Sequence, residues 1–338
     1  MKGRIILKIC LIYMLVVYIM QSTYADSPDQ TFIGYQLIEM QPTMLKKGCM
    51  ILSDSPEQIF ENGILYEERT SGEGRLLFHH LNCTNHAKRL IVTMHNLQNK
   101  PMKVHLYKKE VVGPTKHILF AGKKLLENYF LSQDESLVEI PPLETGILYD
   151  SVNLQWQQKE VLTGIMDFLV EGHGCLKVAC IDRADALEEI TTLSYLQRDC
   201  HPRGTFHILE EAYRLHLPSF GKYYMCMEQE EDWVVGKDGI TQEITMNKGN
   251  YGIMYHVTIQ AEADTNVYLV PRAGVFKGVI QWDDGNLCAI ERTHYFKHFK
   301  EPVLLGCVKA NHIKSLRYML PNGSAAPVWL QFEVVNSY

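Results

Sequence analysis

Apolar and polar residues alternate over much of this chain. In residues 257–262, Val257, Ile259 and Ala261 stand at every second position with polar residues between them, and residues 328–334 alternate in the same way. A period of two is typical of a β-strand that buries one face. Apolar runs bounded by Gly, Asn and Pro predict further strands. These cover residues 75–81, 90–95, 103–107, 136–140, 163–170 and 175–181.

Helical features are confined to three short segments. Residues 55–60 begin with Ser-Pro, which suits the start of a helix, and residues 123–131 place apolar residues three and four positions apart. Residues 183–198 space four apolar residues at roughly three-residue steps. Many short strands with few helices favour an all-β fold of the sandwich type, either jelly-roll or Ig-like.

One stretch of the chain occurs twice. Shifted back by 165 positions, residues 239–272 align with the segment that begins at Gly74. Asn247 and Asn250 then coincide with Asn82 and Asn85. A unit of this length is too long for a solenoid repeat, so we predict an internal duplication of a whole domain. The predicted organisation is a signal peptide (1–25), a first β-sandwich domain (26–183), a helical linker (184–204) and a second β-sandwich domain (205–338).

The first 25 residues have the pattern of a signal peptide. Lys2, Arg4 and Lys8 precede an apolar run over residues 9–20, and the segment ends in Ala25. We therefore expect a secreted, extracellular or cell-envelope protein. The alternative is an uncleaved N-terminal anchor, which would be the only contact with a membrane.

Charge and cysteine content limit the partners and the chemistry. Without the leader, 30 basic residues stand against 39 acidic ones, so the basic patch that binds nucleic acid is not expected. The chain has nine cysteines, eight of them after the leader, and their spacings form no disulfide framework. We expect mostly free, buried thiols.

Four histidines of the first repeat suggest a metal site. His79, His80, His95 and His105 could bind copper or zinc through their imidazoles. The competing interpretation is structural, because the second copy carries other residues at the aligned positions and this group contains no His-x-His element.

Catalytic motifs are missing from the sequence. It contains neither a nucleophile elbow nor a phosphate-binding loop, and the adjacency of Cys200 and His201 is no sign of a catalytic pair, since such pairs are assembled in space. We therefore expect a protein that is not an enzyme and needs no cofactor. A hydrolase whose site the sequence hides is a third hypothesis.

Other surface features have two interpretations each. Asn82 and Asn322 begin N-glycosylation sequons, which matter only in a secretory eukaryote. Trp282 and Trp329 could stack on sugar rings or be partly buried in a sandwich.

Three segments carry a family resemblance: residues 198–206, 249–252 and 321–328. With them the chain resembles uncharacterised exported proteins of Gram-positive spore formers, many of which carry a stalk-like domain named after the copper amine oxidase N-terminus. That group has no assigned activity. The oxidase itself is not implied, because Gly252 follows Asn250-Tyr251 where the oxidase has an acidic residue.

Together these patterns predict a non-catalytic exported protein of the cell surface or envelope. It would bind a wall polymer, a glycan or another envelope protein. The alternative is an extracellular protein that binds copper or zinc through the histidines of the first domain.

Overall fold

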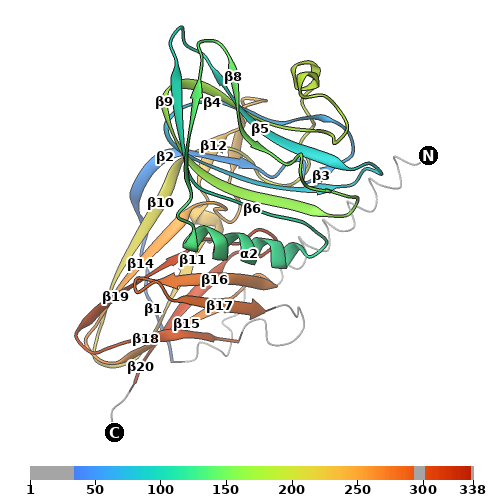
Figure 1. Ribbon diagram of the computed structural model, residues 1–338. Coiled ribbons are helices and arrows are strands. Elements are labelled where there is room, and N and C mark those ends of the chain that lie inside the picture. The colour runs from blue at the N-terminus through green and yellow to red at the C-terminus, as the bar shows by residue number, and fades with distance from the viewer. Residues whose placement is uncertain (1–33, 293–300, 336–338) are drawn as a thin grey trace.

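The computed structural model describes residues 34–292 and 301–335, and the predicted signal peptide lies outside them. Within these ranges most residues form β-strands, so the all-β sandwich class is confirmed. Figure 1 shows two β-rich bodies, one above the other, with the helix α2 (Ile118–Leu131) between them. No helix of the described residues is long and apolar enough to cross a membrane.

The first body is a sandwich made by two long, bent strands. Its strands are β2 (Thr43–Ser53), β3 (Gln58–Ile59), β4 (Gly63–Asn82), β5 (Lys88–Asn96), β6 (Met102–Thr115), β7 (Glu135–Ile140), β8 (Thr145–Asp150) and β9 (Val161–Asp182). β4 and β9 pair antiparallel along their whole length, with a register shift at Gly72, whose φ is 70°. Glycine adopts such a φ without strain, which lets the ribbon bend there.

Bending folds the first body onto its own core. One half of β9 pairs with β6, and the other half pairs with β5. Alternate residues of both layers therefore face each other, and Phe78, Val92 and Val104 are fully buried between them. The alternation in the sequence thus corresponds to real strand faces.

The second body is a sandwich of two sheets. Its strands are β10 (Arg203–Leu217), β11 (Lys222–Met227), β12 (Val235–Lys237), β13 (Ile244–Met246), β14 (Met254–Ala261), β15 (Thr265–Pro271), β16 (Phe276–Trp282), β17 (Leu287–Arg292), β18 (Val303–Val308), β19 (His312–Tyr318) and β20 (Val328–Val334). Five strands form one sheet in the order β1-β11-β20-β15-β18, where β1 is Gln36–Leu37. That sheet packs on β17-β16-β19-β14-β10 around a core of its own.

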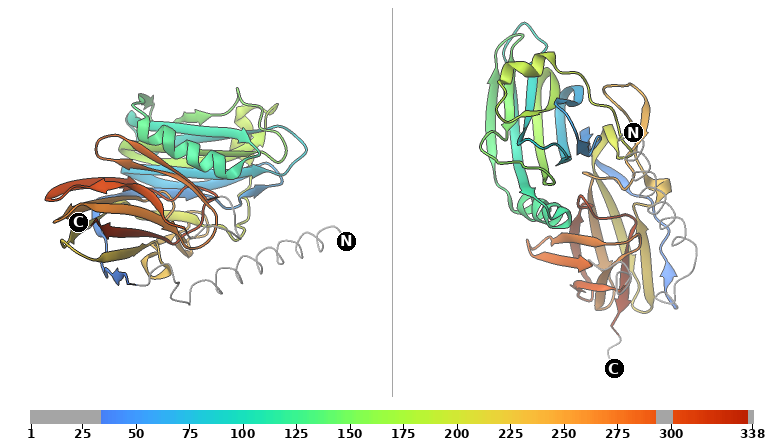
Figure 2. Two further views of the ribbon diagram at one scale, coloured as in Figure 1. Left: turned by 90° about the horizontal axis from the view of Figure 1, so that it is seen from below. Right: turned by 90° about the vertical axis from the view of Figure 1, so that its right-hand side faces the viewer.

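Two features join the bodies. β2 pairs with β4 of the first body and with β10 of the second, so that one sheet of 15 strands runs through the described part of the chain. The helix α2 adds a third core, in which Leu126 and Phe130 pack among side chains of both bodies, including Leu77 and Met319. The right-hand view of Figure 2 shows this helix at the boundary.

The sequence predicts that the first domain begins at residue 26, but the first strands of the described chain pack on the second body. β1 pairs with β11, and residues 43–47 of β2 pair with β10. The first described residues therefore lie on the second body.

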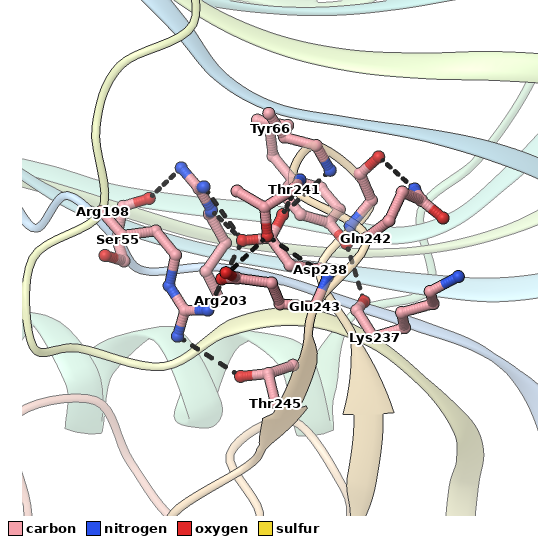
Figure 3. A network of polar contacts seen from close by, with 12 residues as sticks. Ser55, Tyr66, Arg198, Arg203, Lys237, Asp238, Thr241, Gln242, Glu243 and Thr245 are labelled. Atoms are coloured by element: carbon pink, nitrogen blue, oxygen red, sulfur yellow. Dashed lines mark hydrogen bonds and ion pairs between the residues drawn. The ribbon is translucent and has the colours of Figure 1, made fainter.

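The buried side chain of Arg203 connects the two bodies. The guanidinium of Arg203 pairs with Asp238 at 2.9 Å, and both side chains are almost fully buried. Nη1 of Arg203 also donates to the carbonyl oxygens of Ser55, Leu65 and Leu196. Figure 3 shows the part of this network around Ser55, Arg203 and Asp238, which fixes the loop after β2 against the start of β10.

Two predicted helices are absent. Residues 55–60 lead into β3, because Gln58 and Ile59 pair with β4. Of residues 183–198 only η2 (Leu187–Thr192) is helical, and it is a 3-10 turn. Beyond it the chain is held extended, since Leu196 N donates to Ile64 O and Ile64 N donates to Ser194 O. Tertiary pairing here overrides a helical pattern.

The repeat has partial counterparts in the structure. Asn82 Nδ2 donates to His86 O at 2.9 Å, and Asn247 Nδ2 donates to Tyr251 O at 2.8 Å, each across four residues. The aligned strands have different partners: β5 is antiparallel to both neighbours, whereas β14 is parallel to β10. The duplication therefore stays a prediction.

Candidate functional site

The outer face of the five-stranded sheet gathers large aromatic side chains. Along β11, β15 and β20 residues alternate between the core and this face, and Met225, Leu269 and Leu330 point inward. The outward positions carry aromatic and polar residues. They include Lys222, Tyr224, Asn266, Tyr268, Trp329, Gln331 and Glu333. We call these seven residues the aromatic face.

Strand register sets the rings side by side. Gln331 pairs with Tyr224 on one side and with Tyr268 on the other, so an amide lies between two phenols. The ring of Trp329 stacks on Tyr224 with centroids 5.1 Å apart. The guanidinium carbon of Arg272 lies 4.2 Å from the centroid of the Trp329 ring. Stacking and cation–π contacts thus hold the indole in place.

Glu333 organises the polar part of the face. It accepts hydrogen bonds from Lys222 Nζ at 3.2 Å, from Tyr268 OH at 3.5 Å and from Tyr35 OH. Burial, together with the charge of Glu333, raises the pKa of the phenols of Tyr35 and Tyr268. Both phenols therefore remain hydrogen-bond donors at neutral pH.

Sequence reasoning found only part of this face. Trp329 is a predicted candidate, but Tyr224 and Tyr268 are not, although the alternation within residues 222–227 and 265–271 could have indicated them. Trp282, the other candidate, is only 4% exposed and donates through Nε1 to Leu305 O. Its ring is part of the second core and is not available to a sugar.

The four candidate metal histidines do not converge. Three of them pair with well-separated residues of β9: His79 with Thr163, His105 with Leu169 and His95 with Cys175. The six residues from Thr163 to Leu169 span about 20 Å of extended strand, and Cys175 lies beyond the bend of β9, in the half that pairs with β5. One ion therefore cannot be shared by the predicted set of His79, His80, His95 and His105.

Each of these histidines also has its own environment. Burial lowers the pKa of His79 to about 3 and that of His80 to about 4. Both nitrogens of His80 have partners, the hydroxyl of Ser53 and the carbonyl of Pro56. His95 lies 3.0 Å from Thr145 Oγ1, and His105 lies 2.8 Å from Glu171.

Both sequons are structural corners. Asn82 is fully buried, and its Nδ2 donates to the carbonyl oxygens of His86 and Trp156. Asn322 is 6% exposed, and its Nδ2 donates to Thr163 Oγ1. A glycan attached to either nitrogen would be incompatible with this packing, so the folded protein does not carry one there.

The cysteines of the described residues are free thiols, and only Cys200 is exposed. Its Sγ lies 3.8 Å from Nδ1 of His201, so the sequence neighbours are also neighbours in space. This pair belongs to the loop that leads into β10.

A shallow hollow beside the Asn82 corner is lined by charged residues. It is bounded by Glu61, His86, Lys88 and Asp182 among others. Lys88 Nζ donates to Asp182 at 2.7 Å and to Asn62 at 2.6 Å, so its charge is already paired.

Comparison with known proteins leaves the family open. No protein-family model matches the sequence, and no curated protein is similar to it. The resemblance to exported proteins of spore formers therefore stays a prediction.

Solved structures offer only remote likenesses. Tripeptidyl peptidase 2 is 8% identical with a TM-score of 0.18, and the match covers 88% of this chain but 24% of that one. The CUB1-EGF-CUB2 domains of rat MASP-1 are 8% identical with a TM-score of 0.22, and the match covers 82% and 99% of the two chains. Oxalate decarboxylase from Bacillus subtilis is 8% identical with a TM-score of 0.12, over 89% and 78%. At such TM-scores these likenesses carry no argument about fold or function.

Proposed function

We propose that the protein is exported, is not catalytic and binds a glycan of the cell surface or envelope on its aromatic face. The observation that carries the proposal is the row of Tyr224, Gln331 and Tyr268, flanked by Trp329. Sugar rings have one face of C–H groups and a rim of hydroxyls. Tyrosine and tryptophan offer an apolar ring together with a polar group, which matches that combination.

The polar side chains of the face support a sugar ligand. Gln331 is only 2% exposed, so it packs between the two phenols and is not itself available to a ligand. Glu333 and Lys222 lie in the neighbouring row and can bind hydroxyls. The face carries charges of both signs, which does not favour a polyanion such as nucleic acid.

Titration with soluble oligosaccharides tests this proposal. The probes are the N-acetylglucosamine hexamer and solubilised peptidoglycan strands, and the signal is tryptophan fluorescence of the wild type. We expect Trp329→Ala to weaken binding about tenfold or more, which corresponds to about 1.4 kcal/mol; for this variant, binding is followed by calorimetry. Tyr107→Ala is the matched control, because Tyr107 is a half-buried aromatic residue of the first body, stacked on His105.

Two outcomes would overturn the glycan assignment. One is binding of neither carbohydrate by the wild type. The other is binding to an envelope-protein extract that Ile244→Asp abolishes and Trp329→Ala leaves intact. Ile244 is 80% exposed and Val235 is 59% exposed on the β12–β13 hairpin, so that result would assign a protein partner to this hairpin.

A further inference from the structure

We propose that Asp199, Cys200 and His201 form a binding site for a borderline-soft divalent cation, of which zinc is the representative. The three side chains offer a carboxylate oxygen, a thiol sulfur and an imidazole nitrogen, and these atoms all lie within 4.8 Å of one another. Sulfur, nitrogen and oxygen donors of this kind are the ligands of zinc in proteins. The site is separate from the aromatic face and does not depend on glycan binding.

The distances between the donor atoms suit a tetrahedral ion. Asp199 Oδ1 lies 3.1 Å from His201 Nδ1, and Cys200 Sγ lies 3.8 Å from the same nitrogen. Zinc bonds of about 2.3 Å to sulfur and about 2.0 Å to nitrogen or oxygen place tetrahedral neighbours about 3.3–3.6 Å apart. The two pairs that include His201 therefore need shifts of only a few tenths of an ångström, and the donor atoms of Asp199 and Cys200 lie within 4.8 Å of each other.

Neighbouring groups already orient these ligands as a metal site requires. Nε2 of His201 lies 3.1 Å from Glu57 Oε2, and a carboxylate on the far nitrogen is the usual partner of a metal-binding histidine. Asp199 is held by Ser55 Oγ at 2.8 Å and by the backbone N–H of Glu57 at 2.8 Å. Ser55 in turn is fixed by the Arg203 network of Figure 3.

The charge around the site favours a cation. Besides Asp199 and Glu57, Asp54 stands in the same loop as Ser55 and Glu57, and its Oδ1 is buried without a hydrogen-bond partner. Asp199 and Cys200 are exposed, so an ion can reach the site and keep a water as fourth ligand.

A thiol nucleophile fits these contacts less well. A general base needs a free nitrogen toward the thiol, but Nδ1 of His201 is shared with Asp199 and Nε2 faces Glu57. Both nitrogens thus face carboxylates, which hold the proton on the ring. Coordination uses Nδ1 of His201 and Sγ of Cys200 in their deprotonated forms, because zinc displaces a proton from each and releases it to solvent, while Nε2 keeps its proton toward Glu57.

Metal titration of the folded mature chain tests the site. Zinc chloride is titrated by calorimetry into protein freed of metal by a chelator, and cobalt(II) serves as a spectroscopic probe. We expect one equivalent of zinc, and a near-ultraviolet thiolate-to-cobalt charge-transfer band that Cys200→Ser abolishes. Glu57→Gln should keep that band while lowering zinc affinity about 10–100-fold, because Glu57 positions His201 without binding the ion.

His216→Gln is the control variant. His216 is exposed and pairs with Glu262 at 2.9 Å on the second body, and its substitution should change neither affinity nor spectrum. The proposal is overturned if the wild type binds no zinc, or if Cys200→Ser retains the charge-transfer band and full affinity. Circular dichroism of each variant establishes that it is folded, so a loss of binding is not a loss of structure.

Discussion

Buried carboxyl groups make the stability of the second body depend on pH. Burial and the neighbouring charge of Asp232 raise the pKa of Glu211 to about 7, and burial raises the pKa of Glu228 well above its usual value. The folded state therefore favours the protonated acids. The unfolded chain loses these protons near pH 4.5, so their stabilising contribution is complete below that pH and is lost as the pH rises through the folded pKa.

Glu211→Gln isolates one of these groups. Glutamine keeps the shape of the protonated acid and cannot ionise. The wild type should lose unfolding free energy as the pH rises from 4.5 to 8, and the variant should lose less. The difference between the two losses should be at most about 3 kcal/mol. Urea denaturation across this pH range measures the difference. Glu262→Gln, at the surface, should leave the wild-type profile unchanged. Equal pH profiles for Glu211→Gln and wild type would contradict the prediction.

At the scale of elements, apolar spacing predicted a helix correctly once and wrongly once. Residues 123–131 lie in α2, and the apolar face of this helix packs into the core between the two bodies. Residues 183–198 carry a similar pattern, but Ile190 packs on Ile91 and Ile181 while the chain beyond it pairs with Ile64. Such long-range partners leave no local signal in the sequence. For the same reason the Asp199–Cys200–His201 site depends on Glu57, which only the fold brings close.

The close approach of α2 to the second body can be tested at Gly122. A Cβ at this position would lie 2.0 Å from the carbonyl oxygen of Asn322. Alanine gains about 1 kcal/mol of helix propensity over glycine, but the clash should cost more, for a net loss of about 1–3 kcal/mol in Gly122→Ala. Chemical denaturation measures this loss. Lys124→Ala, on the half-exposed side of the same helix, should be nearly neutral. An unchanged or higher stability of Gly122→Ala would show that the helix is free to shift.

For the whole molecule, the sequence indicated two sandwiches but not how firmly they are joined. Alternation within each strand identifies the inner faces, and both bodies have cores built from them. β2 creates the shared sheet and α2 creates the third core. The apolar residues of these two elements do not indicate in the sequence which strands they will contact. Arg75 adds a polar link, since it pairs with Asp167 in the first body and donates to the carbonyl oxygens of Leu209 and Gly252 in the second.

The shared sheet, the third core and the hydrogen bonds of Arg75 predict that the two bodies unfold together. Trp156 is fully buried in the core of the first body, where Nε1 donates to Glu160 O, and the other tryptophans belong to the second body. Trp156→Phe should destabilise the first body by about 1–3 kcal/mol. In this variant, fluorescence reports only on the second body, whereas far-ultraviolet circular dichroism reports on both.

If the third core couples the bodies, the fluorescence transition of Trp156→Phe falls to the same lower urea concentration as the circular dichroism transition, in a single step. Tyr107→Phe, which leaves the first core intact, should leave both midpoints near those of wild type. A fluorescence midpoint that stays at the wild-type value while circular dichroism separates into two steps would mean that the bodies are independent, because the loss of stability would then be confined to the body that carries the substitution.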